Sequence, residues 1–153
     1  MGRRSGTENI VGIAGFGAAI SAAMADLAAG LPKELEKLRI ILESTLADSV
    51  KNTIFVGNEL KRLPNTSCFS TPGWKGETQV MSMDLAGFAI SAGSACSSGK
   101  VRESRVLRAM GFDENVARSA VRVSFGAETK EDEVRRFADA WLSAHEKFAK
   151  RAA

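Results

Sequence analysis

The sequence predicts a small α+β domain: a few-stranded, mostly antiparallel sheet with helices on one face. Short β-prone runs alternate along the chain with longer stretches that carry apolar residues at helical spacing. A length of 153 residues suits one domain with a substantial core, and the hydrophobic fraction of 44% is ordinary for a globular protein. These features favour a layer of helices packed on a small sheet.

The N-terminal third predicts two helices. Residues 5–8, Ser-Gly-Thr-Glu, have the pattern of a capping box, in which Ser5 and Glu8 would satisfy the first free amides of a helix. Gly30-Leu31-Pro32 then marks a break. The first helix would carry an apolar stripe of Ile10, Ile13, Phe16, Ile20, Met24 and Leu27, with glycines that suggest close packing on another element; the second would carry Leu35, Leu38, Leu42 and Leu46.

The middle of the chain predicts short pieces of both kinds. Residues 52–57 and 66–70 read as strands, and 71–73 as a turn. Residues 77–88 predict a helix, residues 89–92 a short strand, and residues 104–110 a short helix that Gly111 ends. The inward residues of the 77–88 helix are expected to be Val80, Met81, Leu85 and Phe88.

The C-terminal third gives the clearest patterns. Residues 120–125 alternate strictly, so Val121, Val123 and Phe125 should face one side and Arg122 and Ser124 the other. Thr129 followed by acids predicts the start of a last helix. Its apolar stripe would be Val134, Phe137, Ala138, Trp141, Leu142, His145 and Phe148.

Composition argues against several classes of function. The net charge is +3, but lysines and arginines are interleaved with acids rather than clustered, so no nucleic-acid partner is expected. Residues 10–29 are apolar but rich in Gly and Ala and contain Asp26, so no membrane span is expected. No signal peptide is visible, and two cysteines are too few for a disulfide scaffold. We therefore expect a cytoplasmic protein with free thiols.

Cys96 is the first candidate for chemistry. It lies in Ser91-Ala-Gly-Ser-Ala-Cys96-Ser-Ser-Gly99, where no bulky apolar neighbour would bury it. Lys100 and Arg102 are close in sequence and would favour the thiolate, which is the reactive form. A free cysteine is also commonly a small buried hydrophobe, so from the residues alone both interpretations stay open.

Arg122 is the second candidate. A guanidinium in the middle of an apolar strand offers two parallel donors that suit a carboxylate. The competing interpretation is a structural ion pair with a nearby acid such as Asp132, and the residues alone favour it. Arg4-Ser-Gly-Thr7 stands at a helix start and could hold a phosphate, although ordinary capping explains it equally well.

The other candidates have structural interpretations. Cys68 lies in a strand-like run between Ser67 and Phe69 and is expected to be structural. His145, the only histidine, falls on the apolar stripe of the last helix and is expected to pack there. Without a His/Cys cluster of suitable spacing, no metal site is expected.

Taken together, the segments resemble the cysteine desulfurases of the NifS/IscS type, which are class-V aminotransferases and fold-type I pyridoxal-phosphate enzymes. The matching pieces come in the family's order. They are Arg4-Ser-Gly-Thr7, Pro64-Asn-Thr66, Gly76-Glu77, the Cys96 segment, Val106-Leu-Arg-Ala-Met-Gly111 and Val121-Arg-Val-Ser-Phe-Gly126. The Cys96 and Arg122 segments together are a specific pair.

The resemblance implies a role for each candidate. Cys96 would take sulfur from L-cysteine as a persulfide and release alanine, Arg122 would bind the substrate carboxylate, and Thr7 would contact the cofactor phosphate across a homodimer interface. The fold would be the C-terminal small domain of such enzymes, residues 31–153, with 1–30 a helix that joins or packs on a large domain. A sulfur-acceptor protein and a place in iron–sulfur cluster assembly are also implied.

The resemblance also implies what this chain lacks. The family's cofactor-binding lysine, stacking histidine and pyridine-nitrogen aspartate would precede residue 1, so we expect no bound pyridoxal phosphate and no desulfurase activity from the chain alone. The uncovered 10–28 face predicts a dimer or larger species. Two alternatives stay open: a stand-alone module that relays a persulfide, and part of an enzyme similar to selenocysteine lyase.

Overall fold

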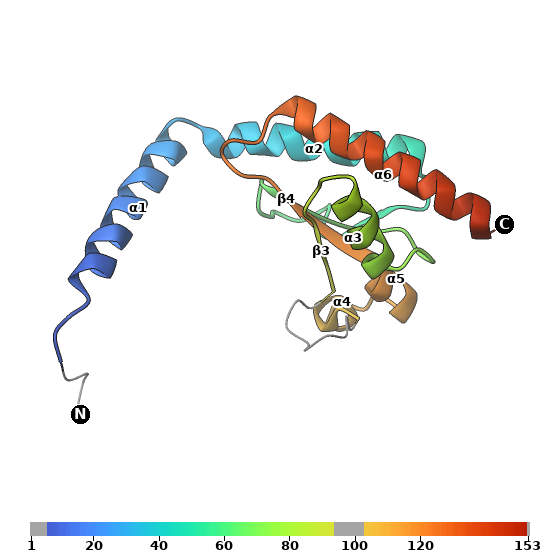
Figure 1. Ribbon diagram of the computed structural model, residues 1–153, viewed down its shortest axis with the longest axis horizontal. Coiled ribbons are helices and arrows are strands. Elements are labelled where there is room, and N and C mark those ends of the chain that lie inside the picture. Colours follow the sequence, from blue (N-terminus) through green and yellow to red (C-terminus); the bar gives the residue numbers. More distant parts are fainter. Residues whose placement is uncertain (1–5, 94–102, 153) are drawn as a thin grey trace.

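The computed structural model describes residues 6–93 and 103–152. Within these ranges the chain forms six helices and four strands, as predicted for an α+β domain (Figure 1). The helices are α1 Ile10–Ala28, α2 Leu31–Ser49, α3 Gly76–Leu85, α4 Arg105–Ala109, α5 Glu114–Ser119 and α6 Glu131–Ala152. The strands are β1 Ile54–Phe55, β2 Thr66–Ser70, β3 Ser91–Ala92 and β4 Ala120–Ser124.

The strands form one antiparallel sheet in the order β1-β2-β4-β3. Strand β4 is central and pairs with β2 on one side and with β3 on the other. Its alternation is confirmed, because Val121, Val123 and Phe125 are buried whereas Arg122 and Ser124 are exposed. The register places Arg122 opposite Cys68 of β2 and opposite Ser91 of β3.

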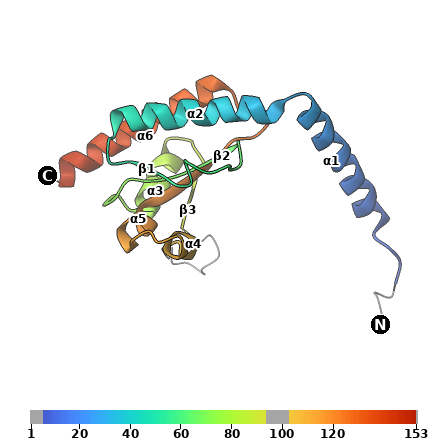
Figure 2. The ribbon, with the colours of Figure 1, turned by 180° about the vertical axis from the view of Figure 1, so that it is seen from behind.

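The core lies between one face of the sheet and the longer helices α2, α3 and α6. Figure 2 shows α2 and α6 side by side along this layer, and residues of both join the same hydrophobic cluster. The buried members are Leu35, Leu42, Leu46, Val50, Phe69, Trp74, Met83, Val121, Val123, Phe125, Val134, Phe137, Ala138 and Trp141. The predicted stripes of α2 and α6 are therefore confirmed.

The other face of the sheet carries two short helices, a departure from the predicted arrangement with helices on one face only. Leu107 of α4 and Ala117 of α5 pack against Ala120 in a second, smaller cluster. The Ser70 hydroxyl donates a hydrogen bond of 2.8 Å to the carbonyl of Val116, which ties α5 to β2. Helix α5 was not predicted, because its six residues are too few to show a period.

Helix α1 projects away from the rest of the chain (Figures 1 and 2). None of its residues is buried, and Phe16 is 69% exposed. By length and composition alone α1 is apolar enough to cross a membrane, with 19 residues and a mean hydropathy of 1.8, which the sequence analysis had not expected. The core helix of a soluble protein and a signal sequence meet the same criterion of length and composition.

Two local predictions were wrong. The capping box at Ser5–Glu8 does not start α1; Ser5 lies outside the described residues, and Asn9 caps the helix by accepting the Gly12 amide at 3.0 Å. Of the residues predicted to point inward from the 77–88 segment, Phe88 packs against the core, whereas Met81 and Leu85 are 67% and 89% exposed. The buried residues of α3 are Gly76, Gln79 and Met83, and the apolar pattern alone did not locate this face, in part because position 79 is an amide.

Candidate functional site

The candidate site is a cavity of about 420 Å³ on the sheet face away from the long helices. We call it the Arg122 cavity. Strands β2, β3 and β4 contribute its floor, and α4 with the residue before it contributes a wall. The volume falls within the range of small-molecule sites. Its lining includes Val56, Cys68, Ser91, Gly93, Ser104, Arg105, Val106, Leu107, Met110, Ala120, Val121 and Arg122.

Arg122 is held in this cavity by its position in the central strand. Both neighbouring strands pair with β4 at this residue, which fixes its backbone. The predicted alternative, an ion pair with Asp132, is not found; Asp132 lies in the first turn of α6, and no acid among residues 6–93 and 103–152 forms an ion pair with Arg122. An exposed guanidinium of this kind can bind a carboxylate with two parallel hydrogen bonds.

Cys68 lies directly across the strand pair from Arg122 and lines the same cavity. Burial raises the pKa of the Cys68 thiol above its ordinary value, while the charges of Arg122 and Arg62 act in the opposite direction. Arg62 is itself engaged, since its Nη2 lies 2.7 Å from Oε2 of Glu43. At neutral pH Cys68 is therefore a neutral thiol and a poor nucleophile, as the structural interpretation predicts.

Cys96 lies outside the described residues. The described chain stops at Gly93, just after β3, and resumes at Glu103, just before α4. Gly93 on one side and Ser104 on the other both line the Arg122 cavity. The segment that contains Cys96 is thus joined at each end to this cavity.

Thr7 is exposed and precedes α1, whose start lies at the far end of the molecule from β4 (Figure 1). The structure therefore does not bring Thr7 together with Arg122 within one chain. Arg4 and Ser5 of the same motif lie outside the described residues.

His145 packs as predicted on the stripe of α6. Its ring stacks on Trp141 with centroids 5.5 Å apart and an interplanar angle of 10°, and it also contacts Trp74. Burial lowers the pKa of His145 below its ordinary value of 6.5, and Glu146 opposes this only partly. Within the described ranges, no group of three His, Cys, Asp or Glu side chains could hold a metal ion.

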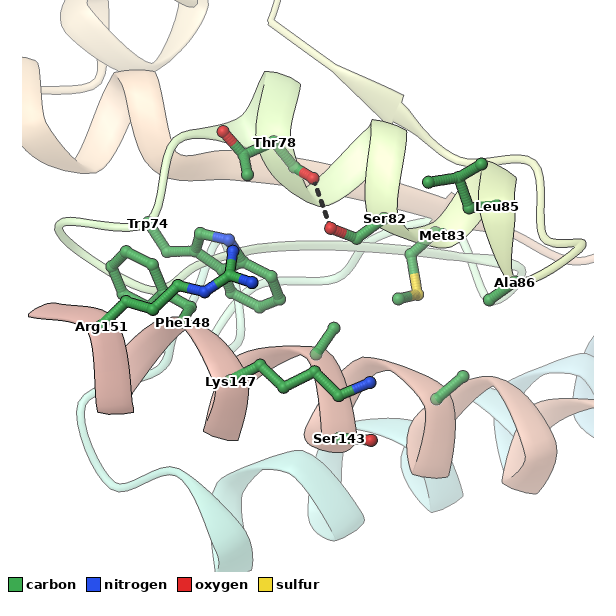
Figure 3. Close-up of a pocket in the computed structure, with 12 residues that line it drawn as sticks. Trp74, Thr78, Ser82, Met83, Leu85, Ala86, Ser143, Lys147, Phe148 and Arg151 are labelled. Atoms are coloured by element: carbon green, nitrogen blue, oxygen red, sulfur yellow. Dashed lines mark hydrogen bonds between the residues drawn. The ribbon is translucent and has the colours of Figure 1, made fainter.

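A second hollow, which we call the α3/α6 groove, lies in the helix layer (Figure 3). Trp74 and Phe148 stack at one end with centroids 5.5 Å apart, and Lys147 of α6 also lines the groove. The hydroxyl of Ser82 is used within α3, where it donates to the carbonyl of Thr78 at 2.8 Å. Among the described lining residues of the groove there is no histidine or acid that could activate a hydroxyl.

Arg105, Ser91 and Ser104 were not predicted to be parts of the site. Ser91 was assigned to a short strand without a role, and Ser104 and Arg105 to a short helix. Their contribution depends on α4 folding back across the sheet edge, a tertiary contact that no local pattern reports. The one available signal was their position at the two ends of the Cys96 segment.

Comparisons of sequence and of structure relate this chain to the same group of known proteins. The sequence profile of the class-V aminotransferases matches residues 1–137. The chain is 36% identical to a cysteine desulfurase of Enterobacter agglomerans and 39% identical to one of Cereibacter sphaeroides, covering 87% and 88% of this chain but 33% and 34% of those proteins. The X-ray structure of a NifS-like protein from Rickettsia africae superposes with a TM-score of 0.80 at 29% identity, over 94% of this chain and 36% of that one. This chain therefore spans about a third of the length of the relatives it matches.

Proposed function

Because the chain belongs to the class-V aminotransferase family, we propose that it is the C-terminal part of a pyridoxal-phosphate-dependent cysteine desulfurase. Curated relatives that bear the name cysteine desulfurase match it over nearly nine-tenths of its length. The net reaction would be L-cysteine plus the Cys96 thiol giving L-alanine plus a Cys96 persulfide. One sulfur atom moves and nothing else is gained or lost, so no external oxidant or reductant is required.

The observation that carries this proposal is the setting of Arg122. It is exposed in a cavity of small-molecule size, and the described residues provide it with no anionic partner. An arginine between two hydrogen-bonded strands has a fixed backbone position, so it would hold a bound carboxylate at a defined place in the cavity. Arg122 would bind the α-carboxylate of L-cysteine and orient the substrate sulfur.

Chain connectivity supports Cys96 as the sulfur acceptor. Cys96 follows Gly93 by three positions in the sequence, a separation that extended chain spans in at most about 11 Å. The other thiol, Cys68, faces the same cavity, but burial keeps its pKa high. The thiolate is the attacking species, so Cys96 rather than Cys68 would accept sulfur and later pass it to an acceptor protein.

The family uses pyridoxal phosphate, and the described residues fit only part of what this cofactor needs. No lysine that could form an imine, and no acid that could pair with a pyridinium nitrogen, is among the described residues lining the Arg122 cavity. Thr7, proposed to contact the cofactor phosphate from a partner subunit, precedes α1, which projects away from the strand that carries Arg122 (Figure 1). The contribution of this chain would be to hold the substrate carboxylate and to accept the sulfur.

We accordingly propose that the chain alone has no desulfurase activity. The test is to incubate it with pyridoxal phosphate and L-cysteine and to measure alanine and sulfide. The expected rate equals that of free pyridoxal phosphate, and turnover above this background would contradict the proposal. The same assay on the chain joined to a class-V large domain that carries the lysine should give alanine, and Cys96→Ser should abolish the persulfide while the cofactor absorbance is retained.

The exposed apolar residues of helix α1 support packing of this helix on further protein. Its apolar stripe is uncovered, and the family profile that matches residues 1–137 includes it. A surface of this kind is normally covered by protein. We propose that residues 1–30 pack on the large domain or on a partner subunit, and that the chain alone forms dimers or larger species. Light scattering that shows a monomer at high protein concentration would contradict this.

Two alternative functions remain distinguishable by experiment. A stand-alone module would carry a persulfide on Cys96 that another enzyme made, and it would do so without the large domain. A selenocysteine lyase-like protein would release selenium faster than sulfur when the assembled protein is offered each amino acid. The relation to cysteine desulfurases supports the first proposal over both.

A further inference from the structure

The Arg122 cavity contains a second arginine that the proposed reaction does not use. Arg105 is the first residue of α4 and is among the residues that line the cavity. The residue before it, Ser104, caps α4 by accepting the Leu107 amide at 3.3 Å. This cap fixes the start of the helix and so keeps Arg105 at the cavity.

Neither arginine of the cavity forms an ion pair within the described parts of the chain. Other arginines do: Arg62 and Arg118 each lie 2.7 Å from a carboxylate oxygen. The acid closest in sequence to Arg105 is Glu103, and its Oε2 lies 3.9 Å from Nε of Arg108. Two arginines that line the cavity therefore have no ion-pair partner among the described side chains.

Acids that could compensate these charges are absent from the described lining of the cavity and from the segments outside the described ranges. No aspartate or glutamate is among the described lining residues. Residues 1–5, 94–102 and 153, which lie outside the described ranges, contain no aspartate or glutamate either. Two cations facing one small cavity repel each other, and an anionic ligand would relieve that repulsion.

We infer that the Arg122 cavity binds short α-amino acids with an anionic side chain, the α-carboxylate on Arg122 and the second negative group on Arg105. The assignment of the α-carboxylate to Arg122 rests on the proposed function, and the second subsite extends it. The thiolate form of L-cysteine belongs to this ligand class, and L-aspartate is its simplest stable member. The hydroxyls of Ser91 and Ser104 line the same cavity and can donate further hydrogen bonds to an anion.

The test compares L-aspartate with L-alanine, which has the same α-amino acid stem and one negative group fewer. Each is titrated into the chain, and the backbone amide shifts of Ser91, Arg105 and Arg122 are followed by NMR. The expected result is tighter binding of L-aspartate by about fivefold, the upper range for one solvent-exposed ion pair. The affinity for L-aspartate should also fall more steeply with added salt, because more charge is screened.

Three variants separate the two subsites. Arg105→Gln should remove the preference for L-aspartate and leave L-alanine binding unchanged, whereas Arg122→Gln should weaken both ligands. Arg118→Gln, which removes the same charge from an exposed surface pair, is the control and should change neither.

The outcomes separate the second subsite from the role of Arg122. Equal binding of L-aspartate and L-alanine, a preference that survives Arg105→Gln, or no saturable shift with either ligand would overturn the inference. If Arg122→Gln fails to weaken L-alanine, the proposed role of Arg122 fails instead. Sulfate included as a third titrant identifies non-selective anion binding, which would also overturn it if sulfate shifts the same amides with the affinity of L-aspartate.

Discussion

Gln79 joins three parts of the core through its side-chain amide. Its Nε2 donates to the carbonyls of Trp74 at 2.8 Å and Ser119 at 2.9 Å, and its Oε1 accepts the Trp141 indole N–H at 3.0 Å. The side chain is fully buried. Ser119 immediately precedes β4, so the amide fixes α3 and α6 against the strand that carries Arg122.

Gln79→Met keeps the side-chain length and removes all three hydrogen bonds. A typical internal hydrogen bond contributes about 1 kcal/mol, and a buried group left without a partner costs about 1–3 kcal/mol. The loss of three bonds with at least one orphaned indole N–H predicts a free energy of unfolding lower by about 3–5 kcal/mol. This is a large share of the total stability of a domain of this size.

Urea unfolding followed by tryptophan fluorescence measures this change directly. Trp74 and Trp141 are 1% and 0% exposed, so both report on loss of the core. Thr78→Ala, at the neighbouring exposed position on α3, is the matched control and should change stability by less than about 0.5 kcal/mol. A change for Gln79→Met below about 1 kcal/mol would refute the assignment of this amide as the connection between the three elements.

Three further predictions concern single residues. Gly76→Ala should lower the free energy of unfolding in urea by about 1–3 kcal/mol, because the new Cβ would lie 2.8 Å from the carbonyl oxygen of Ala120. The control Gly126→Ala, whose Cβ would meet open space, should be nearly neutral. Equal effects of the two variants would contradict the packing argument. Iodoacetamide should alkylate Cys68 more slowly than a free thiol at pH 8. The rate should still rise at higher pH, because burial raises the pKa of the Cys68 thiol. A rate that is already constant at pH 8 would indicate a thiolate and contradict this prediction. His145 binds a proton more readily in the unfolded chain, so the stability due to its lowered pKa is present above the ordinary value of 6.5 and is lost as the pH falls below it. His145→Gln should remove this pH-dependent part of the free energy of unfolding. An unchanged pH profile of stability in the variant would contradict the prediction.

The sequence predicted those parts of the fold that a periodic pattern encodes. The stripe of α6 and the alternation of β4 follow directly from burial against one layer, and both are confirmed. The predictions failed where a buried residue is polar, as at Gln79, and where an element is too short to show a period, as in α5. A hydrogen-bonded amide satisfies the core as well as an apolar residue does, but only tertiary contacts reveal its partners.

The sequence likewise predicted some residues of the candidate site and not others. Arg122 stands out because a charge interrupts an apolar strand, and its place opposite Cys68 and Ser91 then follows from the register. Arg105 gave no such signal, since an arginine in a short exposed helix is ordinary. Its meaning depends on α4 packing over the sheet edge, which is a property of the folded chain.

The most direct test of the central claim is mass spectrometry of the two cysteine-containing peptides after reaction with L-cysteine. The chain would be assembled with a class-V large domain that supplies the lysine, with pyridoxal phosphate bound. We predict one added sulfur atom on the Cys96 peptide and none on the Cys68 peptide, and loss of this product in Arg122→Gln at low L-cysteine concentration. Sulfur on Cys68, or no added sulfur on Cys96 while alanine is formed, would contradict the assignment of Cys96 as the sulfur acceptor.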